Sequence, residues 1–197
     1  AAASVQRPAS CPDRFVFVNT HTFGRHHNQL QEMVNIAVWA RSLNRTAVVG
    51  WFRHNHRWTA MDALYDFSGL SRRYCVIPHK DFAARWGSMP QGQRTAVCAG
   101  QGVADTPVKS QVRKCRMLPG VPAHYDSRHG VDSTKTMLGI ISAAPEAREA
   151  AFLGLSGEIA FFMRPGLLEQ AAAGRLVVPA VHIVAEAADF ATKSGLQ

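Results

Sequence analysis

The order of apolar and polar residues along the chain predicts alternating strands and helices. Residues 14–19 form an aromatic and β-branched run of the kind that fills a buried strand. Apolar residues then recur at helical spacing in two neighbouring stripes, which are Leu30, Met33, Val34, Ala37 and Val38, and Ile36, Trp39, Ala40 and Leu43. Residues 44–51 follow as a second β-type segment. Residues 14–50 are therefore predicted to form one strand–helix–strand unit of an α/β domain.

The remaining pattern predicts shorter elements. They are a short helix over 61–65, a third strand over 74–78, a helix over 81–86, two buried strands over 136–141 and 151–155, and a helix over 181–193. Residues 51–57 read as an aromatic and basic loop, and residues 87–120 as a largely irregular region. Residues 1–12 are rich in Ala, Ser and Pro and indicate a disordered stem. A domain over 13–180 is the expected result.

The turn between the first strand and the first helix carries the most chemistry. A helix N-terminus presents free backbone donors and the positive end of its dipole to an anion. Arg25 adds a planar fork of donors that suits a phosphate, although a plain surface arginine is the alternative. Asn28 is a good N-cap, with Gln31 completing an approximate capping box. Gln29 is expected to orient the turn.

Two blocks of this region resemble a known family. Gly24-Arg25-x-x-Asn28-Gln29 and, one helix later, Leu43-Asn44-Arg45-Thr46 are similar to the opening of the GDP-fucose protein O-fucosyltransferases, which reads Gly-Arg-Phe-Gly-Asn-Gln and then Leu-Asn-Arg-Thr. The resemblance covers about 40 residues. It implies a Rossmann-like parallel-sheet domain, the N-terminal half of a GT-B type glycosyltransferase.

The same resemblance implies a reaction and a set of site residues. The reaction is inverting transfer of fucose from GDP-fucose to a Ser or Thr hydroxyl of a small disulfide-bonded acceptor module, without a further cofactor. Arg25 and Asn28 take the catalytic roles. Four residues take substrate-binding roles, which are Gly24, His26, His27 and Gln29. His26-His27 stand where the family has Phe-Gly, and an imidazole in place of no side chain is expected to crowd the donor.

Residues 181–197 are expected to begin a linker helix toward a second half of the enzyme. The His-x-Arg motif that opens that half in the family has no counterpart here. The chain is therefore expected to be a fragment that is inactive alone. The alternative is a non-catalytic relative that binds a glycan or an anionic ligand through the same turn.

The four cysteines include no C-x-x-C pair, which argues against structural zinc. Cys98 and Cys115 flank a polar, Gly-rich segment that a disulfide would tie down. The family resemblance implies the secretory pathway, in the endoplasmic reticulum or Golgi lumen, where disulfides persist. Asn44 begins an N-glycosylation sequon in a turn that is expected to be exposed.

Composition narrows the remaining possibilities. The chain has 197 residues, 47% of them hydrophobic, and a net charge of +8, which favours anionic partners. The charges are dispersed and accompany no nucleic-acid motif, so nucleic acid is not an expected partner. No run approaches the ~20 apolar residues of a transmembrane helix. His26, His27, His54 and His56 suggest a metal site, but adjacent histidines point in different directions, so no metal is predicted.

Overall fold

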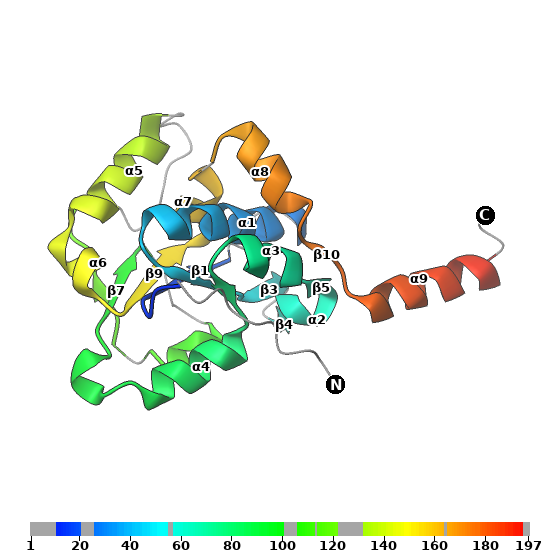
Figure 1. Ribbon diagram of the computed structural model, residues 1–197, viewed down its shortest axis with the longest axis horizontal. Helices are drawn as coiled ribbons and strands as arrows, with labels where there is room; N and C mark the ends of the chain where they lie inside the picture. The colour runs from blue at the N-terminus through cyan, green and yellow to red at the C-terminus, as the bar shows by residue number, and fades with distance from the viewer. Residues whose placement is uncertain are drawn as a thin grey trace.

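A parallel sheet of six strands forms the centre of the computed structural model (Figure 1). The structure describes residues 11–20, 26–54, 57–100, 106–112, 114–121, 132–163 and 165–194. The spatial order is β6-β2-β1-β9-β7-β8, and every neighbouring pair is parallel. The strands are β1 (Phe15–Asn19), β2 (Thr46–Val48), β6 (Val76–Ile77), β7 (Ala96–Ala99), β8 (Arg116–Met117) and β9 (Phe152–Ser156).

Helices cover both faces of the sheet (Figure 1). The longer helices among the described residues are α1 (His26–Ser42), α4 (His79–Ser88), α5 (Asp132–Ala143), α8 (Leu167–Gly174) and α9 (Val181–Lys193), of which α9 does not cover the sheet. The shorter ones are α2 (Met61–Leu64), α3 (Ser68–Arg73), α6 (Pro145–Glu149) and α7 (Gly157–Phe162), with 3-10 turns η1 (Gln91–Gln93) and η2 (Pro107–Ser110). Two small antiparallel sheets pair β3 (Trp51–His54) with β4 (Arg57–Ala60), and β5 (Tyr65–Asp66) with β10 (Val178–Pro179).

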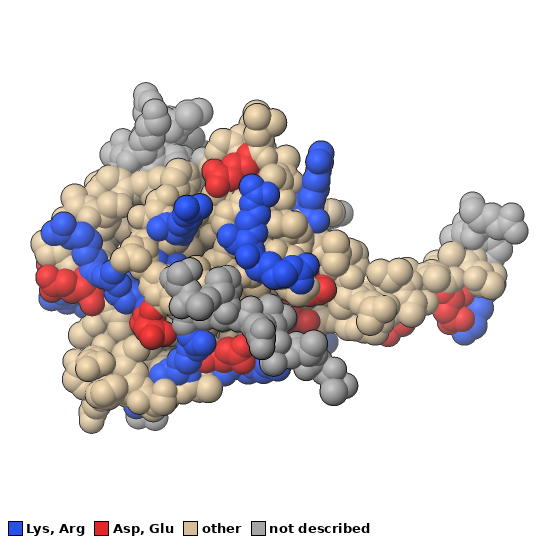
Figure 2. Space-filling model, viewed as in Figure 1, with Lys and Arg blue, Asp and Glu red and all other residues tan. Residues whose placement is uncertain are grey.

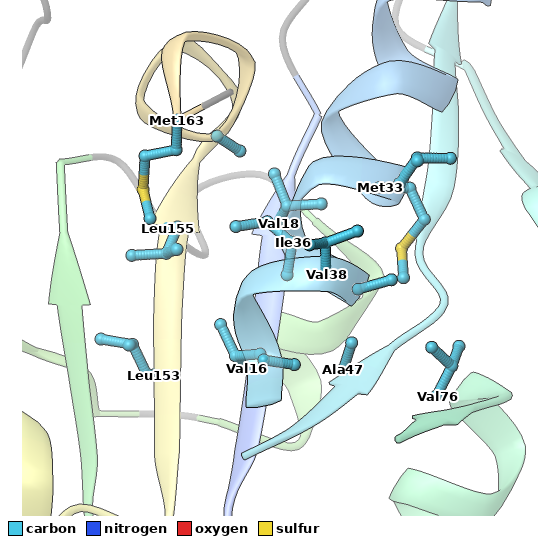
Figure 3. Close-up of a cluster of buried hydrophobic side chains, with 14 of the residues drawn as sticks. Val16, Val18, Met33, Ile36, Val38, Ala47, Val76, Leu153, Leu155 and Met163 are labelled. Atoms are coloured by element: carbon cyan, nitrogen blue, oxygen red, sulfur yellow. The ribbon is translucent and has the colours of Figure 1, made fainter. Parts of the chain in front are cut away.

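The core consists of two clusters, one on each face of the sheet. Val16 and Val18 of β1 point toward α1, where they join Met33 and Ile36 (Figure 3). Phe15 and Phe17, which alternate with them, belong to the opposite cluster together with Phe82 of α4. A strand buried on both faces reads as an unbroken apolar run, which is why the sequence identified β1 so readily.

Buried polar side chains fasten α1 to the later helices. Asn35 is fully buried and donates from Nδ2 to the carbonyl of Ala160 in α7, at 3.0 Å. Its Oδ1 accepts a hydrogen bond from Gln170 of α8, at 2.6 Å. Trp39 donates from Nε1 to the carbonyl of Met163, at 2.6 Å. These bonds explain why a helix with two buried faces carries an asparagine at its centre.

Several predicted elements are confirmed and three are wrong. The helices expected over 61–65, 81–86 and 181–193 and the strands expected over 14–19, 74–78 and 151–155 are present, with bounds shifted by a few residues. The strand expected over 136–141 is instead part of α5. The segment 44–51 is not one strand, because it splits into β2 and β3 around Gly50, where an added Cβ would lie 3.1 Å from the Phe17 ring. The expected loop 51–57 is largely the β3–β4 hairpin.

Two disulfides join distant parts of the domain. Cys98 is bonded to Cys115, as predicted. Cys11 is bonded to Cys75, just before β6, and the carbonyl of Pro12 accepts a hydrogen bond from the Thr46 hydroxyl at 2.6 Å. These contacts attach residues 11 and 12 to the domain, whereas the sequence had placed them in the stem. Residues 1–10 lie outside the described residues, so the stem itself stays a prediction.

The last helix, α9, extends away from the body of the domain (Figure 1). None of its residues is buried, and Val181 and Phe190 are 85% and 65% exposed. No helix in the described part of the chain is long and apolar enough to cross a membrane. Figure 2 shows basic side chains spread over the visible face and interleaved with acidic ones, in agreement with the dispersed charge of the sequence.

Candidate functional site

The candidate site lies at the edge of the sheet where β1 and β9 end. Asn19 and Ser156, the last residues of these strands, are neighbours in register. From β1 the chain builds one half of the sheet through β2 and β6, and the other half contains β9, β7 and β8. The β1/β9 boundary is therefore a topological switch point, where open α/β sheets place their ligands.

The N-terminus of α1 opens at this edge. The helix has 17 residues and no acidic residue in its first turn, so no carboxylate there neutralises the positive end of its dipole. Gly24 and Arg25 precede it and lie outside the described residues. Their predicted roles, substrate binding for Gly24 and catalysis for Arg25, stay predictions.

Asn28 is the third residue of α1, because the helix begins at His26. The prediction that Asn28 is the N-cap, with Gln31 completing a capping box, is therefore wrong: a cap residue stands outside the first turn. Asn28 is half-buried within that turn. Its amide is thus not occupied as a cap, and its catalytic role stays a prediction.

His26 packs into an aromatic cluster beside the turn. Its ring centroid lies 3.9 Å from that of Phe52 in β3, with the planes 27° apart, and 5.4 Å from that of Tyr65. His26, which stands where the resembled family has phenylalanine, thus makes aromatic contacts with its ring. Burial and, to a smaller extent, the adjacent His27 lower the pKa of His26 below its ordinary value. His27 is exposed, and its predicted effect on a donor stays a prediction.

Substituting His26 with phenylalanine is expected to reduce the loss of the free energy of unfolding that occurs as the pH falls below neutral. A histidine with a lowered pKa binds its proton less tightly in the folded state, so stability is lost as the pH falls below the ordinary histidine value. His79, whose pKa is lowered chiefly by burial, contributes to the same decline. Urea denaturation between about pH 7 and 5 measures the slope. His182→Phe removes an exposed histidine and is the control; an equal change in both variants would contradict the assignment.

Gln29 links α1 to the β3–β4 hairpin. Its side chain is only 3% exposed; Nε2 donates to the carbonyl of Arg53 at 2.8 Å, and Oε1 accepts from the Arg53 backbone N–H at 2.6 Å. Nearby, the Thr20 hydroxyl donates to the carbonyl of Trp51 at 2.7 Å. The expectation that Gln29 orients the turn agrees with this geometry, and its substrate-binding role stays a prediction.

Replacing Gln29 with leucine is expected to cost about 2 to 3 kcal/mol of stability, because two backbone groups of Arg53 lose their partners. Gln31→Leu, which changes a less buried residue of the same helix, should alter stability by about 0.5 kcal/mol. Thermal and urea unfolding of both variants provide the comparison. Similar losses in the two variants would show that the paired hydrogen bonds do not carry the effect.

Sequence reasoning missed the polar residues at the end of β9. Ser156 is buried, and no described residue forms a hydrogen bond with its Oγ. The sequence feature that could have indicated them is the run Ser-Gly-Glu directly after an apolar strand. It suggests a second strand followed by a helix, as in β1 and α1. A buried hydroxyl at the switch point is a further polar group that faces this edge.

Two further predicted features concern residues away from this edge. Asn44 is exposed and has a φ of 51°, in the left-handed region that asparagine tolerates, so the sequon is accessible and glycosylation stays a prediction. Of the four histidines weighed as metal ligands, His56 lies outside the described residues. Elsewhere in the described ranges, no three His, Cys, Asp or Glu side chains gather as a metal site would require.

Comparison with solved structures identifies the fold. The chain superposes on the apo form of POFUT1 with a TM-score of 0.62 and 16% identity, covering 94% of this chain and 57% of that one. POFUT1 in complex with GDP-fucose gives 0.59 and 17%, covering 94% and 56%, and POFUT1 in complex with GDP gives 0.59 and 15%, covering 92% and 56%. No family model matches the chain, and no curated protein is significantly similar in sequence.

These likenesses confirm the predicted fold class, a Rossmann-like parallel α/β domain equivalent to one half of a GT-B glycosyltransferase. The chain spans a little over half of the length of the structures it matches, at 57% for the first. At 16% identity the likeness is one of fold.

Proposed function

We propose that this chain forms the N-terminal domain of an O-fucosyltransferase, which transfers fucose from GDP-fucose to a serine or threonine hydroxyl of an acceptor protein. The observation that carries the proposal is that the described part of the motif, His26–Gln29, forms the first turn of α1 on the switch-point edge of the sheet. The fold likeness to POFUT1, which was crystallised with GDP-fucose and with GDP, supports it.

The proposed reaction is a single displacement at the anomeric carbon. The acceptor hydroxyl oxygen forms a bond to C1 of fucose, the bond from C1 to the diphosphate oxygen breaks, and GDP leaves with that electron pair. The hydroxyl proton passes to a base or to solvent. Negative charge therefore builds on the departing diphosphate, and donors fixed before the reaction stabilise it best.

Residues of the turn divide into contact and positioning roles in this proposal. Arg25 and the N-terminus of α1 stabilise the diphosphate, and Asn28 contacts the donor or acceptor from the first turn. Gly24 permits close approach of the backbone. Gln29 positions the turn through Arg53. His27, which is exposed in the first turn of α1, contacts a substrate in this proposal.

A titration with nucleotides tests the proposal. The 197-residue chain is expected to bind GDP and GDP-fucose weakly and to transfer nothing, because the chain spans only 57% of the structure it matches. Calorimetry with GDP, GDP-fucose and UDP-glucose measures selectivity, and a transfer assay uses a small disulfide-bonded acceptor module. Turnover by this chain alone, or equal binding of all three nucleotides, would contradict the proposal.

In a protein that contains both halves, Arg25→Ala is expected to lower transfer efficiency by about one to two orders of magnitude, since charge-assisted hydrogen bonds contribute about 1.5 to 3 kcal/mol. Arg25→Lys should restore little, because lysine keeps the charge but lacks the planar fork. Arg41→Ala, in the exposed last turn of α1, removes the same charge and is the control. Steady-state kinetics on the three variants give the answer, and equal kcat/KM for Arg25→Ala and Arg41→Ala would remove the catalytic role.

The proposed compartment is the lumen of the endoplasmic reticulum or Golgi. Two disulfides with no free cysteine among the described residues support an oxidising environment. The acceptor, in this proposal, is a small disulfide-bonded module that matures in the same compartment. Immunolocalisation of the protein to the cytosol would contradict this assignment.

A further inference from the structure

A groove of about 660 Å³ lies between the second half of α4 and the segment that follows η2. We call it the α4 groove, and its main lining residues are Trp86, Gln91, Arg94, Gln111, Val112 and Lys114. Trp86 and Val112 form its apolar floor and are themselves 5% and 2% exposed. Gln91, Arg94 and Lys114 are exposed on its walls. The groove therefore combines a closed apolar floor with polar, solvent-facing walls.

The α4 groove is separate from the candidate fucosyltransferase site. Arg94 stands two residues before β7 begins, and Lys114 stands two residues before β8 begins. Val97 and Arg116 are partners in register, so both cations lie at the edge where these parallel strands start. Asn19 and the β1–α1 turn lie at the opposite edge, where the strands end. A ligand in this groove would leave the proposed fucose-transfer site uncovered.

The cationic wall of the groove is held in place before any ligand arrives. Arg94 donates from Nε to the carbonyl of Met89 at 2.7 Å and from Nη2 to the carbonyl of Gly87 at 2.6 Å, at the end of α4. These bonds fix the plane of the guanidinium, and Nη1 takes no part in them. A guanidinium whose plane is already fixed loses little conformational entropy when it binds a carboxylate.

The backbone of the opposite wall is also attached to the domain. Trp86 donates from Nε1 to the carbonyl of Gln111 at 3.0 Å, which joins the floor of the groove to its far side. Val112 is buried directly after Gln111. The Cys98–Cys115 disulfide then anchors the chain one residue beyond Lys114. Lys114 is thus presented from a segment with three attachments to the domain.

The chemistry of the lining selects the kind of ligand. Among the described residues that line it, there are two cations, Arg94 and Lys114, no carboxylate, and the exposed amide of Gln91, which can pair with peptide groups. A single inorganic anion is too small to fill a groove of this volume, and the indole of Trp86 is too buried to stack on a nucleic-acid base. We propose that the α4 groove binds an extended acidic peptide segment of a partner protein, whose carboxylates pair with Arg94 and Lys114.

The test uses a defined probe and a matched pair of variants. The probe is a fluorescein-labelled, terminally blocked octapeptide of alternating glutamate and alanine, and its affinity is measured by fluorescence anisotropy. Lys114→Glu is expected to weaken binding about tenfold or more. Lys109→Glu makes the same charge change on an exposed residue of η2 that does not line the groove, and it should change the affinity less than about twofold.

Unlabelled competitors distinguish a peptide site from a general cationic surface. The unlabelled glutamate peptide should displace the probe, and the peptide of alternating glutamine and alanine should not. Displacement by a single-stranded oligonucleotide as effectively as by the glutamate peptide would overturn the proposal. Equal losses in the Lys114→Glu and Lys109→Glu variants, or the absence of saturable probe binding to the unmodified chain, would also overturn it. Thermal unfolding of both exposed-lysine variants should match that of the unmodified chain.

Discussion

Replacing Arg45 with methionine is expected to lower the free energy of unfolding by about 3 to 5 kcal/mol. Arg45 precedes β2 and is 2% exposed. Its Nη1 donates to the carbonyl of Phe15 at 2.9 Å, and its Nη2 donates to the carbonyls of Ala147 and Ala150. Methionine fills a similar volume but leaves three carbonyls without this donor. Urea denaturation measures the loss.

The pH dependence and a matched variant separate this effect from a general loss of charge. Burial, and then the nearby Arg14, lowers the pKa of Arg45 to about 10. Below about pH 9, Arg45 keeps its proton in both the folded and the unfolded state. The loss of the free energy of unfolding in Arg45→Met should therefore be constant from about pH 6 to 9. Arg41→Met, in the exposed last turn of α1, should cost less than about 1 kcal/mol. A loss at Arg45 no larger than at Arg41 would refute the structural role.

Removing the Cys11–Cys75 disulfide is expected to cost about 4 kcal/mol, and removing Cys98–Cys115 about 3 kcal/mol. The difference follows from the length of chain that each bond closes in the unfolded state, 64 residues against 17. Paired cysteine-to-serine variants, unfolded in urea under non-reducing conditions, measure both. If loss of the shorter loop were the more damaging, constraint of the unfolded chain would not be the main source of stabilisation.

The parts of the fold that sequence reasoning predicted are those with a local signal. β1, α1 and β9 are apolar runs whose length and spacing leave few alternatives, and all three are where they were expected. The apolar run 136–141 is compatible with a buried strand, which was predicted, and also with a helix, because Leu138 and Ile141 are three residues apart. In the structure it belongs to the helix α5. Gly50 lies between β2 and β3, and an added Cβ there would lie 3.1 Å from the Phe17 ring, a close approach that no local pattern reveals.

Only the position of the candidate site could be predicted from the sequence motif. The position of the turn at the carboxyl end of β1 follows from the strand–helix order. The partners of Arg45 lie 30, 102 and 105 residues away, so its role in holding β1 and the end of α6 together could not be read from its neighbours. Four cysteines allow three pairings, and the pair that includes Cys11 was hidden because its segment is rich in Pro and Ser.

The position of β9 governs when the sheet can close. It is the single strand that joins β6-β2-β1 to β7-β8, and it is the last of the six to leave the ribosome, because it begins at Phe152. Until then the inner edges of β1 and β7 have no partner from their own chain, and unpaired strand edges are the surfaces on which nascent chains aggregate. Closure also awaits pairing across a long sequence separation, which slows folding. We therefore expect chains that end before residue 152, through nonsense or frameshift changes, to aggregate rather than to fold in part.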